Sequence, residues 1–197
     1  MRIRILGLAL AATVIAAAAT QVDAQARGRQ ADTPNGYLCC NMRAYDGEAY
    51  DINYENEGDR ILAFGSPVAL TAQSARKLRM RIGGERYVLE NHYSRDLDEA
   101  AFVARYVLAE DPRVAAASYP AHIRQAIEAG QVTPGMTREQ VRMSLGWPIS
   151  SENPDLDAPV WRYWLSSFDE VQVEFDDSGH VIDLTASALT RRRLWLP

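Results

Sequence analysis

The chain has 197 residues and a formal net charge of -5, with 21 Lys and Arg against 26 Asp and Glu. Binding to nucleic acid requires a basic face that neutralises phosphates, so this acidic balance argues against nucleic acid as a partner. The length is enough for one larger domain or for two small domains that pack together.

Residues 1–24 have the pattern of a secretory signal peptide. Arg2 and Arg4 form a positively charged start, and an apolar run rich in Ala and Leu follows from Ile5 to Ala19. This run is shorter than the roughly 20 apolar residues that a membrane-spanning helix needs. We therefore predict an exported protein that is cleaved after Ala24 or Ala26.

A flexible leader is expected at residues 25–36, because turn formers occur there without apolar periodicity. The next region, residues 37–117, is predicted to be a β-rich domain with one helix. Strand patterns occur at 60–64, 68–71, 77–82 and 86–90, and short strands with tight turns favour a small barrel or a curled sheet, with an SH3-like domain as one candidate. Acidic residues followed by apolar residues at helical spacing predict the helix over 97–110.

Cys39 and Cys40 are the two cysteines of the chain. In an oxidising compartment, a vicinal disulfide, pairing between molecules, and free thiols with a redox or metal role all remain open. Neighbouring Cα atoms lie about 3.8 Å apart, below the usual disulfide span of roughly 4.4–6.8 Å, so a vicinal disulfide would be strained.

Catalytic and cofactor motifs are absent from the sequence. It contains no Gly-x-Ser-x-Gly elbow, no phosphate-binding Gly loop and no His-Glu-x-x-His zinc helix. We therefore predict no catalytic residue, no metal and no cofactor. The alternative is a periplasmic metal-binding protein or enzyme that uses Glu90 and His92, with Asp96 and Asp98 nearby, although a polar loop entering a helix explains the same residues.

Two short helices and three strands are predicted within residues 118–188. The first helix should begin near Pro120 and end at Gly130, and the second should run from a Thr137–Gln140 capping box to Gly146, which needs a positive φ. Strand patterns follow at 160–164, 171–175 and 181–184. The helices should cover one face of a three-stranded antiparallel sheet, which makes the fold class α+β.

The residues of this region resemble the BamE domain, also called the SmpA/OmlA domain, over about residues 119–187. The motifs that carry the resemblance are Gly135-Met136-Thr137, Leu145-Gly146-Trp147-Pro148, the pair Trp161 and Tyr163, and Val171-Gln172-Val173-Glu174-Phe175 before Gly179. The resemblance implies a helix-helix-three-strand fold and a non-catalytic accessory role in outer-membrane protein assembly in a Gram-negative bacterium. It also implies an envelope protein as partner and a location in the periplasm or at the periplasmic face of the outer membrane. A secreted inhibitor-type protein is another use of this small fold.

Aromatic residues are the candidates for protein contacts, because Trp and Tyr supply the anchors of binding hot spots. Period-2 geometry sends Trp161 and Tyr163 to one face of their strand and Trp164 to the other, and one of these faces must be core. The candidate contacts are Trp147, Trp161, Tyr163, Trp164 and Trp195.

The last residues, 189–197, are predicted to be a basic and aromatic tail. Arg191, Arg192 and Arg193 would favour an acidic partner or a weak, salt-sensitive contact with an anionic membrane. Alternatively, Leu194 to Leu196 pack back on the protein.

Overall fold

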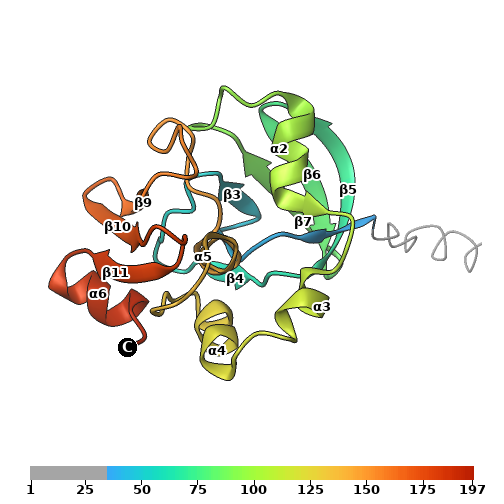
Figure 1. Cartoon of the computed structure of the whole chain (residues 1–197). Helices are drawn as coiled ribbons and strands as arrows, with labels where there is room; N and C mark the ends of the chain where they lie inside the picture. Colours follow the sequence, from blue (N-terminus) through green and yellow to red (C-terminus); the bar gives the residue numbers. More distant parts are fainter. Residues whose placement is uncertain (1–34) are drawn as a thin grey trace, which may run out of the picture. The chain divides into compact units, whose positions relative to one another are not determined.

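A computed structural model describes residues 35–197 of the chain, which belong to one compact unit (Figure 1). The predicted signal peptide and nearly all of the predicted leader lie outside the described residues. The described part is mixed α+β, as the sequence predicts. None of its helices is long and apolar enough to span a membrane.

The N-terminal region contains a six-stranded sheet with the strand order β3-β7-β6-β5-β1-β8. All neighbouring strands are antiparallel except β3 and β7, which are parallel. The strands are β1 (Gly36–Leu38), β3 (Glu48–Tyr50), β5 (Pro67–Ser74), β6 (Lys77–Ile82), β7 (Glu85–Glu90) and β8 (Val107–Leu108). A separate pair joins β2 (Met42–Ala44) to β4 (Arg60–Leu62). The edge strands of this sheet, β3 and β8, are not paired with each other. The SH3-like domain that the sequence suggested is not confirmed.

Helix α2 (Glu99–Tyr106) packs on this sheet and buries Phe102 and Tyr106 in the N-terminal hydrophobic cluster. Asp98 caps its start, because the Asp98 carboxylate accepts a hydrogen bond from the Ala101 N–H at 2.8 Å. The helix is shorter than the predicted span of 97–110. Val107 and Leu108 leave the helix because they pair with Leu38 and Tyr37 of β1, and a short helix α3 (Pro112–Ala116) follows.

The C-terminal region has the predicted order of two helices and three strands. Helices α4 (Ala121–Ala129) and α5 (Arg138–Leu145) precede the antiparallel sheet β11-β10-β9, formed by β9 (Val160–Ser166), β10 (Asp169–Phe175) and β11 (Val181–Thr185). The buried faces of these helices and strands form one hydrophobic cluster. The alternation of buried and outward residues along β9 and β10 follows the sequence pattern.

The residues at the two ends of α5 explain where this helix begins and where it ends. Thr137 and Gln140 form the predicted capping box, with both reciprocal hydrogen bonds present. Gly146 has the predicted positive φ of 87°, but its ψ of -178° differs from that of a left-handed cap. A Cβ at Gly146 would also lie 3.2 Å from Nδ2 of Asn53, so both backbone and space favour Gly there.

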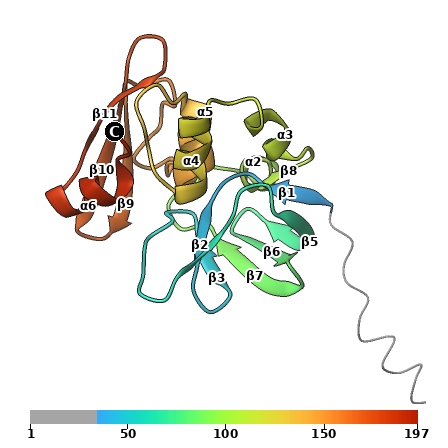
Figure 2. The same cartoon turned by 90° about the horizontal axis from the view of Figure 1, so that it is seen from below.

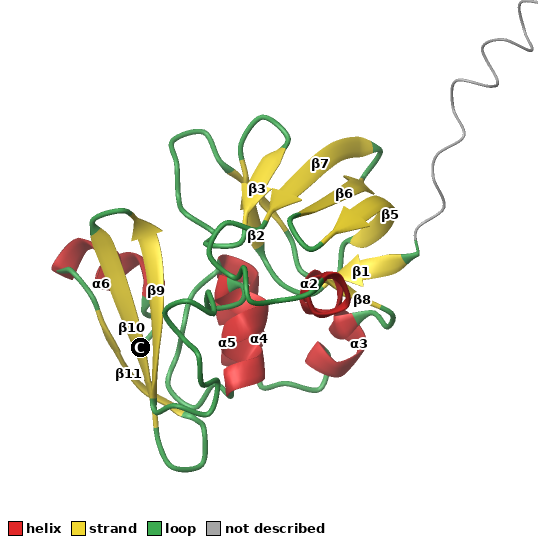
Figure 3. Ribbon diagram, turned by 90° about the horizontal axis from the view of Figure 1, so that it is seen from above, coloured by secondary structure: helices red, strands yellow, loops and turns green. Residues whose placement is uncertain are grey.

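Helices α4 and α5 form a middle layer between the three-stranded sheet and the N-terminal strands, as Figures 2 and 3 show from opposite sides. The predicted tail contains a further helix, α6 (Ala188–Leu194), which sequence analysis missed. Its Leu194 belongs to the C-terminal hydrophobic cluster.

Candidate protein-interaction surface

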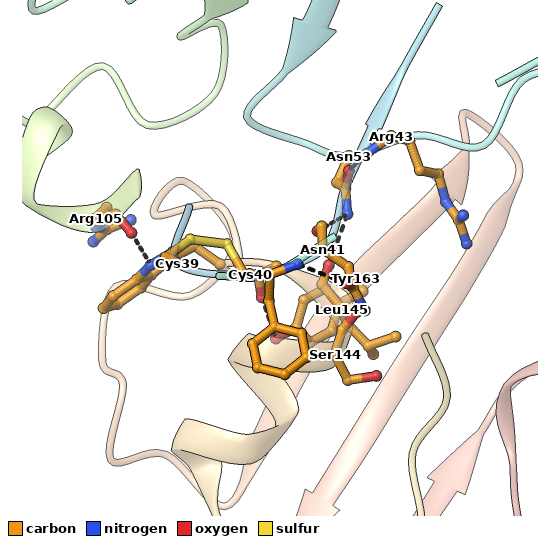
Figure 4. The surroundings of a disulfide bond; sticks show 12 residues. Cys39, Cys40, Asn41, Arg43, Asn53, Arg105, Ser144, Leu145 and Tyr163 are labelled. Atoms are coloured by element: carbon orange, nitrogen blue, oxygen red, sulfur yellow. Dashed lines mark hydrogen bonds between the residues drawn. A yellow bond between two sulfur atoms is a disulfide. The ribbon is translucent and has the colours of Figure 1, made fainter. Parts of the chain in front are cut away.

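The helix layer is covered on its second side by the N-terminal region, and Asn41 makes the central contact (Figure 4). The Asn41 side chain, which is buried, donates to the carbonyl oxygens of Ile127 at 2.6 Å and Ser144 at 3.2 Å. Its Oδ1 accepts from the Phe64 N–H at 3.1 Å, and its own N–H donates to the Met143 carbonyl at 2.9 Å. This face of α4 and α5 is therefore occupied within the chain and is not open to a partner.

Cys39 and Cys40 directly precede Asn41 and are joined by a disulfide in the structure (Figure 4). Both side chains are buried in the N-terminal hydrophobic cluster. The Cys39 N–H donates to the Tyr106 carbonyl at 3.1 Å, which ties this segment to the end of α2. The disulfide thus lies between the hydrogen bond to α2 on one side and the contacts of Asn41 with α4 and α5 on the other.

Trp147, which follows α5, also contacts the N-terminal region. Its Nε1 donates to the Arg105 carbonyl at 2.7 Å, and the guanidinium carbons of Arg105 and Arg142 lie 4.8 Å and 4.3 Å from the centroid of the ring. Burial lowers the pKa of the Arg142 guanidinium. Contacts between cations and an aromatic face stabilise this arrangement, so Trp147 joins parts of its own chain.

The remaining aromatic candidates divide between core and surface. Trp161 and Tyr163 lie in the core, where the Tyr163 hydroxyl donates to the Gly146 carbonyl at 3.2 Å. Trp195 is half-buried against the same core. Trp164 is half-buried on the other face of β9, which leaves it as the predicted aromatic residue on the outer side of the sheet.

Both edges of the three-stranded sheet are covered. On the β9 edge, Asn153 receives the Arg162 N–H at 2.7 Å and donates to the Arg162 carbonyl at 2.9 Å, while the Glu55 N–H donates to the Leu165 carbonyl at 2.8 Å. On the β11 edge, the segment before α5 exchanges backbone hydrogen bonds with Val181. Since an added strand needs free backbone groups, a partner is not expected to extend this sheet.

The outer face of the sheet carries paired charged side chains, whereas the turn of the β9–β10 hairpin exposes an aromatic ring. Arg162 pairs with Glu152 at 3.0 Å and lies 2.9 Å from Glu170 on the outer face. Phe168, between β9 and β10, is 97% exposed. A fully exposed aromatic side chain at a turn is a candidate protein contact, because burying Phe contributes about 1.5–3 kcal/mol.

Comparison with known families identifies the C-terminal region. Residues 123–184 match the family model described as the outer membrane protein assembly factor BamE domain. The C-terminal part of the chain is a BamE domain. The N-terminal region has no family match. No curated protein and no solved structure matches the chain.

The basic end of the chain is held by contacts with the BamE domain and with the N-terminal region. Arg191 pairs with Asp183 at 2.7 Å, and Arg193 pairs with Glu55. The hydrogen bond from Arg191 holds the pKa of the Asp183 carboxyl below its usual value. Arg192 is exposed and has no partner within residues 35–197. Two of the three predicted surface cations are thus already engaged.

The alternative metal site has no support in the described residues. His92 Nε2 lies 3.0 Å from Glu90, and Lys77 Nζ lies 2.6 Å from the other oxygen of Glu90. The hydrogen bond from Lys77 lowers the pKa of Glu90. Between residues 35 and 197, no three His, Cys, Asp or Glu side chains gather in a way that could hold a metal ion.

Sequence reasoning missed Phe168, although a signal was present. The segment Ser166-Ser167-Phe168-Asp169 reads as a turn between two alternating strands, and Phe is an unusual residue there. An apolar residue that a turn cannot bury would have been a better candidate for a contact than the aromatic residues inside the strands.

Proposed function

We propose that the chain is a non-catalytic, exported protein-binding module that assists outer-membrane protein assembly at the periplasmic side of the outer membrane. The match of residues 123–184 to the BamE domain carries this proposal. The partner is then another envelope protein of the assembly machinery.

The tip of the β9–β10 hairpin, with Phe168, is the proposed point of contact. The helix layer and the sheet edges of the BamE domain are already covered within the chain, which leaves the hairpin tip and the outer face of the sheet. The Asp169 carboxylate accepts a hydrogen bond from the Thr190 hydroxyl at 2.5 Å, which brings the tip next to α6. There Leu189 is also exposed.

A protein pocket suits this tip better than an anionic membrane does. Asp169 and Glu170 follow Phe168 directly, and the chain as a whole is acidic, so negative charge at the tip opposes approach to anionic lipid. An apolar pocket in a protein would bury Phe168 without that repulsion.

Deletion and complementation test the function. Cells that lack the chain should contain less folded β-barrel protein in the outer membrane, as measured by the heat-modifiable mobility of porins. The wild-type chain and a Val114→Ser variant should restore the level, whereas Phe168→Ser should not. Val114 is the matched control because it is an apolar residue that is 77% exposed on α3.

Unchanged levels of folded porins after deletion would contradict the role in assembly. Restoration by Phe168→Ser to the level reached with Val114→Ser would contradict the contact at the tip, while leaving the role in assembly standing.

A further inference from the structure

Four aromatic side chains form a continuous row on the N-terminal region, in the order Tyr50, His92, Tyr93, Tyr54. The centroids of neighbouring rings lie 5.2, 6.3 and 6.5 Å apart. Neighbouring rings are tilted by 51° to 56°, so they do not stack on each other. His92 and Tyr93 are exposed, whereas Tyr50 and Tyr54 are half-buried. The four residues of this aromatic row lie outside the matched residues 123–184.

The loop that carries His92 and Tyr93 is held by a buried carboxylate. Asp51 is 2% exposed and accepts the N–H groups of His92 at 2.9 Å and Tyr93 at 3.0 Å. A buried carboxylate is costly unless hydrogen bonds satisfy it, so these contacts fix the loop backbone firmly.

The other side of the same loop is also fixed. Asn91 donates to the Ser94 carbonyl at 2.8 Å, and the Ser150 N–H donates to the Ser94 hydroxyl at 3.2 Å. The Ser151 N–H donates to the Tyr93 carbonyl at 3.3 Å. A loop ordered in this way presents its exposed rings in one arrangement, which reduces the entropy lost on binding.

A hollow of about 530 Å³ lies beside the row and adds polar groups to it. His92 and Tyr93 line the hollow together with Arg95, Asp96 and Ser151. Arg95 is exposed and has no partner within residues 35–197, and Asp96 accepts from the Ser150 hydroxyl. The Arg95 guanidinium and the Asp96 carboxylate carry opposite charges, so the side chains that line the hollow have no net charge.

We propose that the aromatic row and the adjoining hollow bind an uncharged oligosaccharide of linked pyranose rings. Pyranose rings present apolar C–H faces that pack on aromatic rings, and hydroxyls that both donate and accept hydrogen bonds. Arg95 can donate a hydrogen bond to a sugar hydroxyl, and the Asp96 carboxylate can accept a hydrogen bond from one. The two charges of the hollow balance, and the carboxylates of Glu48 and Glu90 beside Tyr50 and His92 disfavour a polyanion along the row.

A chain of sugars fits the row better than an extended peptide does. The sheet edge next to the row is β3, which has three residues and ends at Tyr50. Such a short edge gives an added peptide strand few backbone hydrogen bonds. Several rings in sequence instead offer repeated contacts to a repeating ligand.

Titration of the purified exported chain with chitotetraose, an uncharged β-linked tetrasaccharide, tests the proposal. Amide NMR shifts should saturate for His92, Tyr93, Arg95 and Ser151. Tyr93→Ala should weaken binding at least tenfold, and Tyr45→Ala should leave it unchanged. Tyr45 is the matched control, since it is 57% exposed in a different turn and makes no ring contact with the row.

Arg95→Ala provides a second variant that removes no contact from the fold, and it should also weaken binding. Absence of saturable shifts would overturn the proposal, as would equal binding by Tyr93→Ala, Arg95→Ala and Tyr45→Ala. Preferential binding of a proline-rich peptide or of a charged hyaluronan tetrasaccharide would overturn the ligand class. Ser151 at the rim of the hollow lies within the matched residues 123–184, but the hairpin tip with Phe168 does not line the hollow, so these outcomes do not bear on the role in outer-membrane assembly.

Discussion

Replacing Asn41 with Ala should destabilise the described part of the chain, because Asn41 joins the N-terminal region to the helices of the BamE domain. The substitution removes the hydrogen-bond partners of the Phe64 N–H and of the Ser144 carbonyl. The Ile127 carbonyl keeps a second partner in the Gly130 N–H at 3.1 Å. The buried Ser144 carbonyl and the partly buried Phe64 N–H are thus left unsatisfied.

An unsatisfied buried group costs about 1–3 kcal/mol and a partly buried group costs less, so Asn41→Ala should lower the free energy of unfolding by at least about 1–3 kcal/mol. Asn41→Asp should cost at least as much at neutral pH, since a carboxylate would face the Ile127 and Ser144 carbonyls. Those carbonyls would raise the folded-state pKa of the new carboxyl above its unfolded value. Part of the stability of this variant should therefore be present at low pH and lost as pH rises through that pKa.

Urea unfolding followed by Trp fluorescence and by circular dichroism measures these changes. Asn56→Ala is the control, because Asn56 is exposed and its side chain contacts Asp59 in its own turn. Equal unfolding midpoints for Asn41→Ala and Asn56→Ala would refute the assignment of Asn41 as the junction contact.

Three further predictions follow from the packing of the BamE domain and its surroundings. Leu145→Ala should cost roughly 2–5 kcal/mol, whereas His92→Ala should change the melting temperature little, because Leu145 is core and His92 is exposed. Removal of residues 190–197 should lower the melting temperature by circular dichroism, since Leu194 is buried; an unchanged transition would contradict this packing. The lowered pKa of Asp183 means that its pairing with Arg191 should persist at neutral pH and be lost only as pH falls through the folded-state value, which Trp195 fluorescence can follow; loss of the signal above the ordinary Asp pKa of about 3.9 would contradict the pairing.

The C-terminal fold was predictable from sequence because its signals are local. Val171, Val173 and Phe175 alternate along one strand, and the Thr137–Gln140 capping box marks the start of α5. Such patterns depend on residues two to four positions apart, which sequence analysis detects directly.

The short strands of the N-terminal region were not predictable in the same way. Strands β1, β2, β3 and β8 have two or three residues each, too few to show alternation. Val107 and Leu108 read as the end of a helix, and only their pairing with β1 makes them a strand. Pairing with strands distant in the sequence therefore determines these strands, and local propensity does not.

The candidate interaction surface was predictable only in part. Period-2 geometry correctly separates Trp161 and Tyr163 from Trp164, but does not say which face another element covers. Asn41 contacts carbonyls 86 and 103 residues away in the chain, and no local pattern indicates contacts of that range.

Site-specific photocrosslinking at position 168 in living cells tests the proposed function most directly. With a photoreactive phenylalanine derivative in place of Phe168, irradiation should link the chain to a protein of the outer-membrane assembly machinery, identified by mass spectrometry. The same derivative at Val114 should give no such product. Absence of the product at position 168, or the same product from both positions, would contradict the proposal that this BamE domain docks on the assembly machinery through its hairpin tip.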